Sequence, residues 1–469
     1  MQQTPDSILI IGSGLMGLTT AWTLTKRARF ANTTITIVDH SRGTSFPPED
    51  AASVDTSRII RADYADPDYA SFAAEAQAQW RQPGDDKVGG QGRYSESGMV
   101  VMAEDIDGRE KDKKTGMEYV KASWENVASI AERQGHSNKV RTIEGRENLK
   151  KIVGTDGNPG TWGYVNQMSG WADNAAGMRW LYEQVRRTNR VKFVDAEVKE
   201  LVTEGKKVVG ARVQDGSVLR GDIVYLAAGA WSGALIDLRG RCEATGHVLG
   251  YIDITQEEQE IMDTKPIMIN FATGHFVIPA KHRLLKVARH GFGYLNPVVC
   301  PNALPLSPED ERKPIVASIP RTARDHGGEG FPAEADADLR KALTNMCPLK
   351  GLETRPWAKQ KICWYSDTRD ADWLVDWHPN WENLFVVTGD SGHGFKFLPV
   401  IGDKLVDVLE GKGGNFANKW RWKEVVNDVC GRVDENGVFQ GLLTWDGSRG
   451  GKPGMILAEE FKKGGKAKL

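Results

Sequence analysis

The chain has 469 residues, a length that suits two or three domains better than a single core. Hydrophobic residues make up 40% and charged residues 26% of it, which is the composition of a soluble globular protein. The formal net charge of -2, with scattered Lys and Arg, argues against a nucleic-acid or anionic-membrane surface. No apolar run reaches the roughly 18 residues that a membrane span needs.

The cysteine pattern points to an intracellular protein with reduced thiols. The chain has five cysteines, an odd number without paired spacing, which argues against a disulfide framework or a zinc site, and we expect no metal. The first apolar run, Ile8 to Ile11, is too short for a signal peptide.

The first predicted elements form a strand–turn–helix–strand unit. Ile8–Ile11 is typical of a buried parallel strand and leads directly into the glycine turn Gly12-Ser13-Gly14-Leu15-Met16-Gly17. A helix is expected from Leu18, and the next strand, Thr34–Val38, ends on Asp39.

This unit predicts a dinucleotide site on a Rossmann-type half-fold. Gly12 permits the tight turn, Gly14 lets the backbone approach a pyrophosphate, and Gly17 lets the helix pack closely on the sheet. The positive end of the helix then faces the phosphates, and the Asp39 carboxylate can accept hydrogen bonds from ribose hydroxyls. The glycine turn alone does not separate FAD from NAD.

The rest of the chain alternates between helical and strand patterns. Helices are expected over 114–134, 178–188 and 399–411, and strands over 191–193, 208–213, 223–226 and 384–387. We therefore predict an α/β protein, α+β overall, with a Rossmann-like domain and a second domain built on a mixed β-sheet. The first domain is discontinuous (1–66, 151–240 and 355–412), the second comprises 67–150 and 241–354, and 413–469 is a covering segment and tail.

Up to about Lys412 the chain resembles the sarcosine oxidase branch of the D-amino-acid-oxidase-like flavoproteins, which includes monomeric sarcosine oxidase and the fructosyl amino acid oxidases. The resemblance rests on five stretches in the family's order: 12–17, Asp55-Thr56-Ser57-Arg58-Ile59-Ile60-Arg61, Ala227-Ala228-Gly229-Ala230-Trp231, Leu285-Lys286-Val287-Ala288-Arg289-His290, and Cys363–Asp370 followed by Ser391-Gly392-His393-Gly394-Phe395-Lys396. The chain departs from the family at Asp39, where glutamate is more usual, and at the additional Ser57.

The resemblance implies FAD, held covalently as a thioether on Cys363. A lone cysteine between Ile362 and Trp364 would otherwise more often be an inert buried thiol. The cofactor-binding residues that follow from the glycine turn and the resemblance are Gly12, Gly14, Leu15, Met16, Gly17, Asp39, Ser57, Arg58, Val198, Gly229, Trp231, Cys363, Gly392, His393, Gly394, Phe395 and Lys396.

The resemblance also assigns the catalytic and substrate-binding residues. Lys286 would stabilise the negative charge that develops on oxygen, although a strand lysine more often faces solvent. His290 would shape the active site, with a structural histidine as the alternative, and Arg58 would lie close to the flavin ring. Arg61 and Lys396 match the pair that grips a substrate carboxylate, a task that suits the guanidinium fork.

The expected function is therefore the oxidation of a secondary amino acid, N-methylated or cyclic, to an imine that hydrolyses, with O2 reduced to H2O2. Saccharopine or a fructosyl amino acid is the close alternative as substrate. An NAD-dependent dehydrogenase of opine or imine type would share the glycine turn and Asp39, but it would not explain Cys363 or the stretch 391–396.

The last three residues, Ala467, Lys468 and Leu469, are a close variant of the Ser-Lys-Leu peroxisomal signal. We expect recognition by the peroxisomal import receptor, with the cytoplasm as the alternative location. A producer of H2O2 would suit that compartment.

Overall fold

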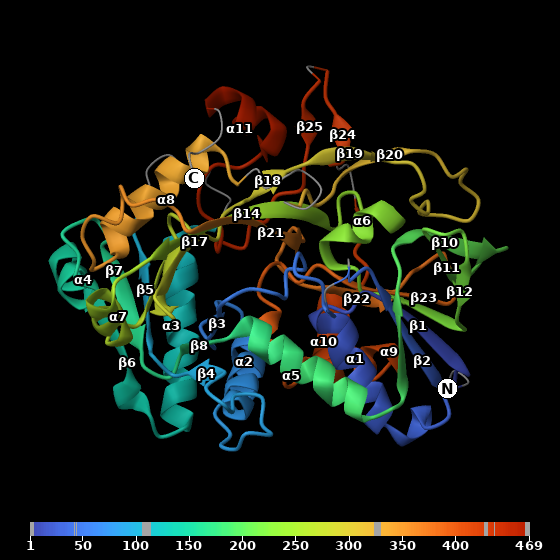
Figure 1. Cartoon of the computed structure of the whole chain (residues 1–469), viewed down its shortest axis with the longest axis horizontal. Coiled ribbons are helices and arrows are strands. Elements are labelled where there is room, and N and C mark those ends of the chain that lie inside the picture. The colour runs from blue at the N-terminus through green and yellow to red at the C-terminus, as the bar shows by residue number, and fades with distance from the viewer. Residues whose placement is uncertain are drawn as a thin grey trace.

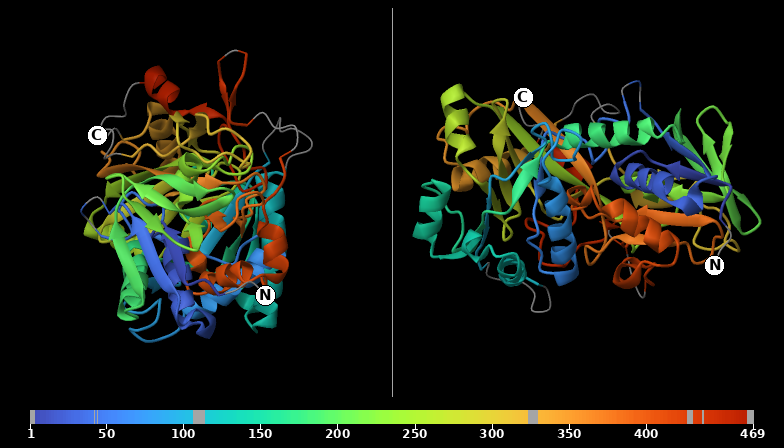
Figure 2. Two further views of the ribbon diagram at one scale, coloured as in Figure 1. Left: turned by 90° about the vertical axis from the view of Figure 1, so that its right-hand side faces the viewer. Right: turned by 90° about the horizontal axis from the view of Figure 1, so that it is seen from below.

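A computed structural model describes residues 4–41, 43, 45–105, 114–322, 330–425, 430–435 and 437–464. Two large sheets lie toward opposite ends of the long axis, with helices between and around them (Figures 1 and 2). The mixed α/β fold agrees with the class expected from the sequence. No described helix combines the length and the apolar character that crossing a membrane requires.

The six-stranded sheet contains the predicted Rossmann-like unit. Five of its strands are parallel and only β22 is antiparallel. The three central strands β1, β13 and β23 are apolar and buried, as expected where both faces of a parallel sheet are covered. The strand order is β22 (Leu374–Trp377), β23 (Leu384–Thr388), β13 (Ile223–Leu226), β1 (Ser7–Ile11), β2 (Thr34–Asp39) and β9 (Val191–Asp195).

Helix α1 (Leu15–Lys26) starts directly after the glycine turn and packs against α5 (Asn174–Arg187) and α9 (Ile401–Leu409). Gly402 makes the contact of α1 with α9 close, because a Cβ there would lie 2.5 Å from the carbonyl oxygen of Thr19. The predicted helix over 399–411 is thus found as α9, which begins at Ile401 and ends at Leu409, and the short η4 (Phe395–Phe397) precedes it.

The ten-stranded sheet forms the other half of the molecule. Its long central strand β14 (Glu243–Asp253) pairs with β17 (Leu284–Arg289) and with β21 (Lys359–Asp367). The remaining strands are β26 (Met455–Ile456), β18 (Tyr294–Leu295), β16 (His275–Lys281), β15 (Ile267–Asn270), β5 (Met99–Ala103), β7 (Trp162–Asn166) and β6 (Val140–Glu144). Helices α3 (Gly116–Arg133), α4 (Arg146–Val153), α7 (Gln256–Asp263) and α8 (Ala333–Met346) pack on it.

The division into two domains stays a prediction, but three strands pair across its expected boundaries. β7 and β21, both placed by sequence in the Rossmann-like domain, belong to the ten-stranded sheet. β26 lies in 413–469, which was expected to be a covering segment and tail, and it adds an edge strand to the same sheet. Backbone hydrogen bonds between distant segments decide these memberships, and local sequence pattern does not report them.

Smaller elements connect the two halves. A three-stranded sheet of β3 (Arg58–Ile60), β8 (Gly170–Ala172) and β4 (Tyr94–Ser95) lies at the centre of the molecule next to α2 (Pro67–Trp80) (Figure 1). The hairpin β10 (Val198–Glu204), β11 (Lys207–Val213) and β12 (Val218–Arg220) flanks the six-stranded sheet. The further described elements are η1 (Ala28–Phe30), η2 (Ser137–Lys139), η3 (Gly229–Trp231), α6 (Ser232–Leu235), β19 (Pro297–Cys300), β20 (Ile315–Ser318), α10 (Gly414–Trp420), β24 (Arg432–Val433), β25 (Phe439–Gln440) and α11 (Leu457–Gly464).

Candidate active site

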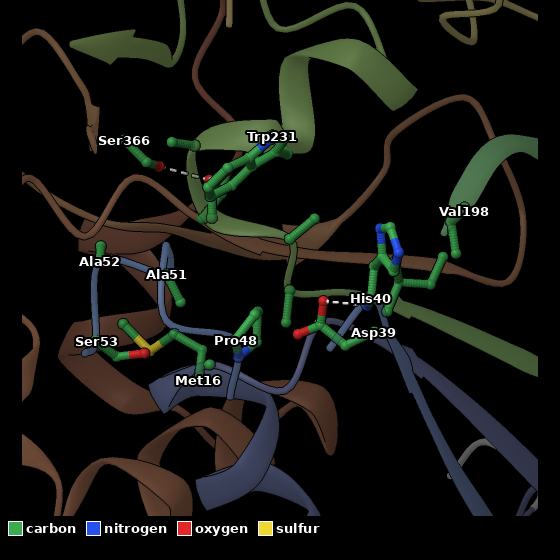
Figure 3. Close-up of a pocket in the computed structure, with 18 of the residues that line it drawn as sticks. Met16, Asp39, His40, Pro48, Ala51, Ala52, Ser53, Val198, Trp231 and Ser366 are labelled. Carbon is green, nitrogen blue, oxygen red and sulfur yellow. Dashed lines mark hydrogen bonds between the residues drawn. The ribbon is translucent and has the colours of Figure 1, made fainter. Parts of the chain in front are cut away.

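A groove of about 260 Å³ opens where β1, β2, β13 and β23 end. In a parallel sheet these carboxyl ends meet at one edge, which is where open α/β sheets bind their ligands. Eight of the predicted cofactor-binding residues line the groove: Gly12, Gly14, Leu15, Met16, Asp39, Val198, Gly229 and Trp231. Figure 3 shows Met16, Asp39, Val198 and Trp231 around it.

The glycine turn has the backbone geometry that a phosphate cradle requires. Gly12 has a φ of +107°, and a Cβ at this position would lie 2.3 Å from the carbonyl oxygen of Ala227. At Gly14 a Cβ would meet only the Ser53 hydroxyl, at 3.5 Å, so the backbone is open to the groove. Gly17 instead packs inward, since a Cβ there would lie 2.0 Å from the carbonyl oxygen of Gly12.

Asp39 faces the start of α1 from the end of β2. Its Oδ2 accepts hydrogen bonds from the backbone N–H and the hydroxyl of Ser13, both at 2.7 Å, and Oδ1 accepts from the N–H of His40 at 2.8 Å. Burial raises the pKa of Asp39, and these hydrogen bonds oppose the rise. The carboxylate is therefore fixed in place at the groove wall, where it can accept hydrogen bonds from the hydroxyl groups of a ligand.

A buried cluster of charges lies between the two sheets. Lys286 on β17 is only 2% exposed and points inward, not to solvent. Its Nζ donates to Oδ2 of Asp55 at 2.6 Å and to the carbonyl of Ser57 at 2.8 Å. Asp55 also accepts from the Arg58 guanidinium and from the Tyr251 hydroxyl, so one carboxylate holds two cations.

The charged groups in this cluster shift one another's pKa values. Burial alone would raise the pKa of Asp55, but Lys286 and Arg58 hold it well below its ordinary value. Burial lowers the pKa of Lys286 to about 8, although Asp55 opposes the shift. Lys286 is therefore a cation at neutral pH that loses its proton far more readily than an exposed lysine.

Cys363 lies beside the same cluster on β21. Its Sγ is 3.2 Å from Nη2 of Arg58, which also donates to the carbonyl of Ala52 at 2.9 Å. Ala52 lines the groove, so the thiol lies next to the groove wall without itself being part of it.

A second cavity of about 400 Å³ lies on the other side of the glycine loop 389–394. Asp390 lines the groove and its neighbour Ser391 lines the second cavity, so this loop separates the two spaces. The polar residues of its wall include Arg61, Tyr64, His290 and Asp446.

Arg61 lines this cavity, and Lys396 lies directly behind two of its wall residues, Tyr64 and His393. Nη1 of Arg61 is buried and has no hydrogen-bond partner among the described residues. Lys396 donates from Nζ to the Tyr64 hydroxyl and to the carbonyl of His393, both at 2.8 Å. Burial and the charge of nearby Arg61 hold the pKa of Lys396 well below its ordinary value. An anion entering the cavity would give Nη1 of Arg61 a partner and would offset the positive charge of Arg61 that lowers the pKa of Lys396.

The glycine loop carries the remaining predicted residues. Gly392 has a φ of +70°, and a Cβ there would overlap the Tyr365 ring at 2.1 Å. The His393 ring lines the second cavity and contacts the Tyr64 hydroxyl at 3.0 Å. Gly394 approaches Met16, whereas Phe395 packs against Trp80 in the core and lines neither space.

Three residues that carry the site were absent from the sequence prediction. Asp55 stood inside the quoted 55–61 stretch, and an acid so near two predicted functional arginines was a usable signal. Asp446 and Arg449 come from the segment after residue 413, which had no counterpart in the family resemblance. Arg449 is 2% exposed and reaches His290, so this segment does more than cover the molecule.

Comparison with known proteins places the chain in a family. The model of the DAO family, described as FAD dependent oxidoreductase, matches residues 7–408, so the chain belongs to this family. It is 30% identical over 467 residues to the amino acid oxidase imqH of Aspergillus flavus, covering 87% of this chain and 95% of the relative. It is 28% identical over 437 residues to L-saccharopine oxidase of Schizosaccharomyces pombe, covering 89% and 93%.

Solved structures agree on the fold. Fructosyl peptide oxidase from E. terrenum superposes with a TM-score of 0.76 at 23% identity, covering 98% of each chain. The family match identifies the protein as an oxidoreductase that uses FAD, and the relatives are amino acid oxidases acting on amine donors. The groove and its glycine cradle fit that dinucleotide.

Proposed function

We propose that this protein oxidises the carbon–nitrogen bond of a secondary amino acid, N-methylated or cyclic, with O2 as acceptor. The observation that carries the proposal is the buried Nη1 of Arg61, which lacks a partner among the described residues and belongs to a residue that lines the second cavity. A buried guanidinium nitrogen left unpaired is costly unless a ligand completes it. A substrate carboxylate does so, and Lys396 beside it adds a second donor.

The size of the cavity bears on the substrate. About 400 Å³ lies within the range of pockets that bind drug-sized ligands. This favours a substrate with a sizeable side chain over the smallest N-methyl amino acids. Saccharopine and fructosyl amino acids are the alternatives that the same volume supports, since an L-saccharopine oxidase is similar in sequence and a fructosyl peptide oxidase is similar in fold.

We propose that FAD lies along the groove and is attached to Cys363. Residues Gly12 to Met16 and Asp39 would hold its pyrophosphate and ribose, and Val198 would contact the adenine end. The cofactor supplies the redox chemistry of the C–N bond. The position of Cys363 supports the linkage, because its Sγ lies 4.0 Å from the carbonyl of Ala52, a residue of the groove wall.

The chain's own residues divide the remaining tasks. Arg61 and Lys396 bind the carboxylate and so orient the amine. Lys286 supplies a fixed cation where negative charge develops on oxygen, in a site without solvent, where such stabilisation is strong. Asp55 keeps Lys286 and Arg58 in place. The imine product leaves the cavity and hydrolyses in water.

The test is a peroxide assay on the purified protein with N-methyl amino acids, cyclic amino acids, saccharopine, fructosyl amino acids and the matching amines without a carboxylate. Turnover of an amino acid but not of its descarboxy amine supports the proposal. Arg61→Lys is expected to lower kcat/KM by about 10- to 100-fold, the loss of one hydrogen bond to a charged group. Arg141→Gln, an exposed arginine on β6, is the control. Turnover that is equal with and without the carboxylate would overturn the assignment.

We also propose a peroxisomal location. The three terminal residues Ala467, Lys468 and Leu469 lie outside the described residues, and the support is their match to the signal and the H2O2 that the proposed reaction forms. A fluorescent fusion that carries these three residues at its C-terminus should be imported into peroxisomes. The same fusion with Ala467→Asp should stay in the cytoplasm. Equal distribution of both fusions would refute the signal.

A further inference from the structure

Arg449 enters the active site from the C-terminal segment, beyond the residues that the family model matches. Its Nη1 lies 2.9 Å from both ring nitrogens of His290. Its Nη2 donates to Oδ1 of Asp367 at 2.6 Å and to the carbonyl of Ser391 at 2.9 Å. One guanidinium thus joins three parts of the site: the residue after β17, the end of β21 and the glycine loop.

The backbone next to Arg449 is also held against the segment around His290. The N–H of Gly450 donates to the carbonyl of His290 at 3.3 Å, and the N–H of Phe292 donates to the carbonyl of Gly450 at 3.2 Å. A Cβ on Gly450 would lie 2.1 Å from the carbonyl carbon of Thr273, so glycine is required for this contact. The segment is therefore docked on His290 by main chain and side chain together.

This geometry determines which form of His290 can exist. A guanidinium can only donate, so it needs an acceptor on the ring. A neutral imidazole keeps one acceptor nitrogen, whereas a protonated ring has none and adds a second positive charge beside Nη1. Because Nη1 is equally far from both ring nitrogens, the contact favours the neutral ring without selecting its tautomer. His290 lines the substrate cavity, so the charge of its ring matters at that wall.

We propose that Arg449 is a positioning residue of the oxidase, which holds His290 as a neutral imidazole at the wall of the substrate cavity. The role rests on the proposed function, since it matters where an amine must bind beside Arg61 and Lys396. An additional cation there would repel the substrate's amino group, and a neutral His290 avoids that charge.

The groups that face His290 from other elements agree with this role. Arg61 on the loop after β3, His247 on β14, and His393 on the glycine loop add positive charge or compete for protons, and Tyr365 on β21 contacts the ring. Asp446 is an acidic group of the same cavity. Burial first, and then the charge of Arg449, hold the pKa of His290 well below its ordinary value.

The experiment titrates His290 directly in the flavin-loaded protein. The ring signals of ¹³C-labelled histidine are followed by NMR against pH, with His290→Gln to assign the resonance. In the natural protein the His290 signal should stay that of a neutral ring down to the acid limit of the fold. In Arg449→Gln the midpoint should rise by one pH unit or more, because a cation at hydrogen-bond distance is lost.

Two further variants separate charge from folding. Arg449→Lys keeps a cation and should keep His290 neutral, and Arg432→Gln, an exposed arginine of the same segment, should change nothing. Bound-flavin absorbance and melting temperature show which variants are folded. A folded Arg449→Gln whose His290 does not shift would overturn the proposal.

The kinetic arm uses the substrate found in the peroxide screen. In Arg449→Gln, kcat/KM should fall as the pH is lowered, with the midpoint that NMR gives for His290. In the His290→Gln background, Arg449→Gln should cause no further loss of kcat/KM. Additive losses in the double variant would overturn the role. If no amino acid is oxidised, the proposed function fails, while the NMR titration still decides whether Arg449 controls the state of His290.

Discussion

The buried pair of Lys286 and Asp55 makes a prediction about stability. Asp55→Asn removes the carboxylate that accepts from Lys286 at 2.6 Å, where both side chains are at most 3% exposed. Lys286 and Arg58 then lose their shared counter-charge. Breaking a buried pair on one side costs about 3–5 kcal/mol, because it leaves charge uncompensated in the interior.

The measurement is urea unfolding of the flavin-loaded protein followed by circular dichroism. Asp68→Asn is the matched control, because its carboxylate pairs with Lys419 at 3.0 Å but is 39% exposed. An exposed pair is worth about 0–1 kcal/mol. If Asp55→Asn costs no more than Asp68→Asn, the buried cluster does not hold the site together as described.

The same variant changes the pH dependence. Burial lowers the pKa of Lys286 to about 8, and Asp55 limits the fall. Without Asp55 the pKa must fall further, so Lys286 loses its charge at lower pH. If that charge assists oxygen, reoxidation of the reduced flavin slows as pH rises through the pKa of Lys286, and in Asp55→Asn the slowing begins at lower pH. Stopped-flow reoxidation measures this, and an unchanged midpoint would refute the role of Lys286.

Three further changes test the cofactor site. In Cys363→Ser the flavin should move to the supernatant on acid precipitation, whereas it stays with the natural protein; colour released from both would contradict the covalent link. Asp39→Ala should weaken FAD binding in the Cys363→Ser background by about 10-fold or more, the loss of hydrogen bonds to a charged acceptor, measured by flavin fluorescence on dilution. Tyr251→Phe removes one donor to Asp55 and should lower the free energy of unfolding by about 1.5–3 kcal/mol, and a neutral effect would show that Asp55 needs only its cations.

The dinucleotide groove was predictable because its determinants are local. The order of an apolar run, three spaced glycines and an acid at the next strand end specifies backbone conformation and spacing within 40 residues, and the structure has Gly12, Gly14 and Asp39 at the groove. Arg61, Lys286 and Lys396 were found by the motifs around them. The position of Asp55 beside Arg58 and Arg61 was a local signal, but nothing in the sequence indicated that Asp55 would also hold Lys286.

The tertiary structure alone decided how distant segments meet. Sheet pairing brings Cys363 on β21 and Lys286 on β17 to either side of β14, although they are far apart in sequence. Arg449 reaches His290 across 159 positions of chain, from a segment whose glycines and tryptophans carry no periodic pattern. Such contacts depend on the register of strands and on the space left by neighbouring side chains, which only the folded chain defines.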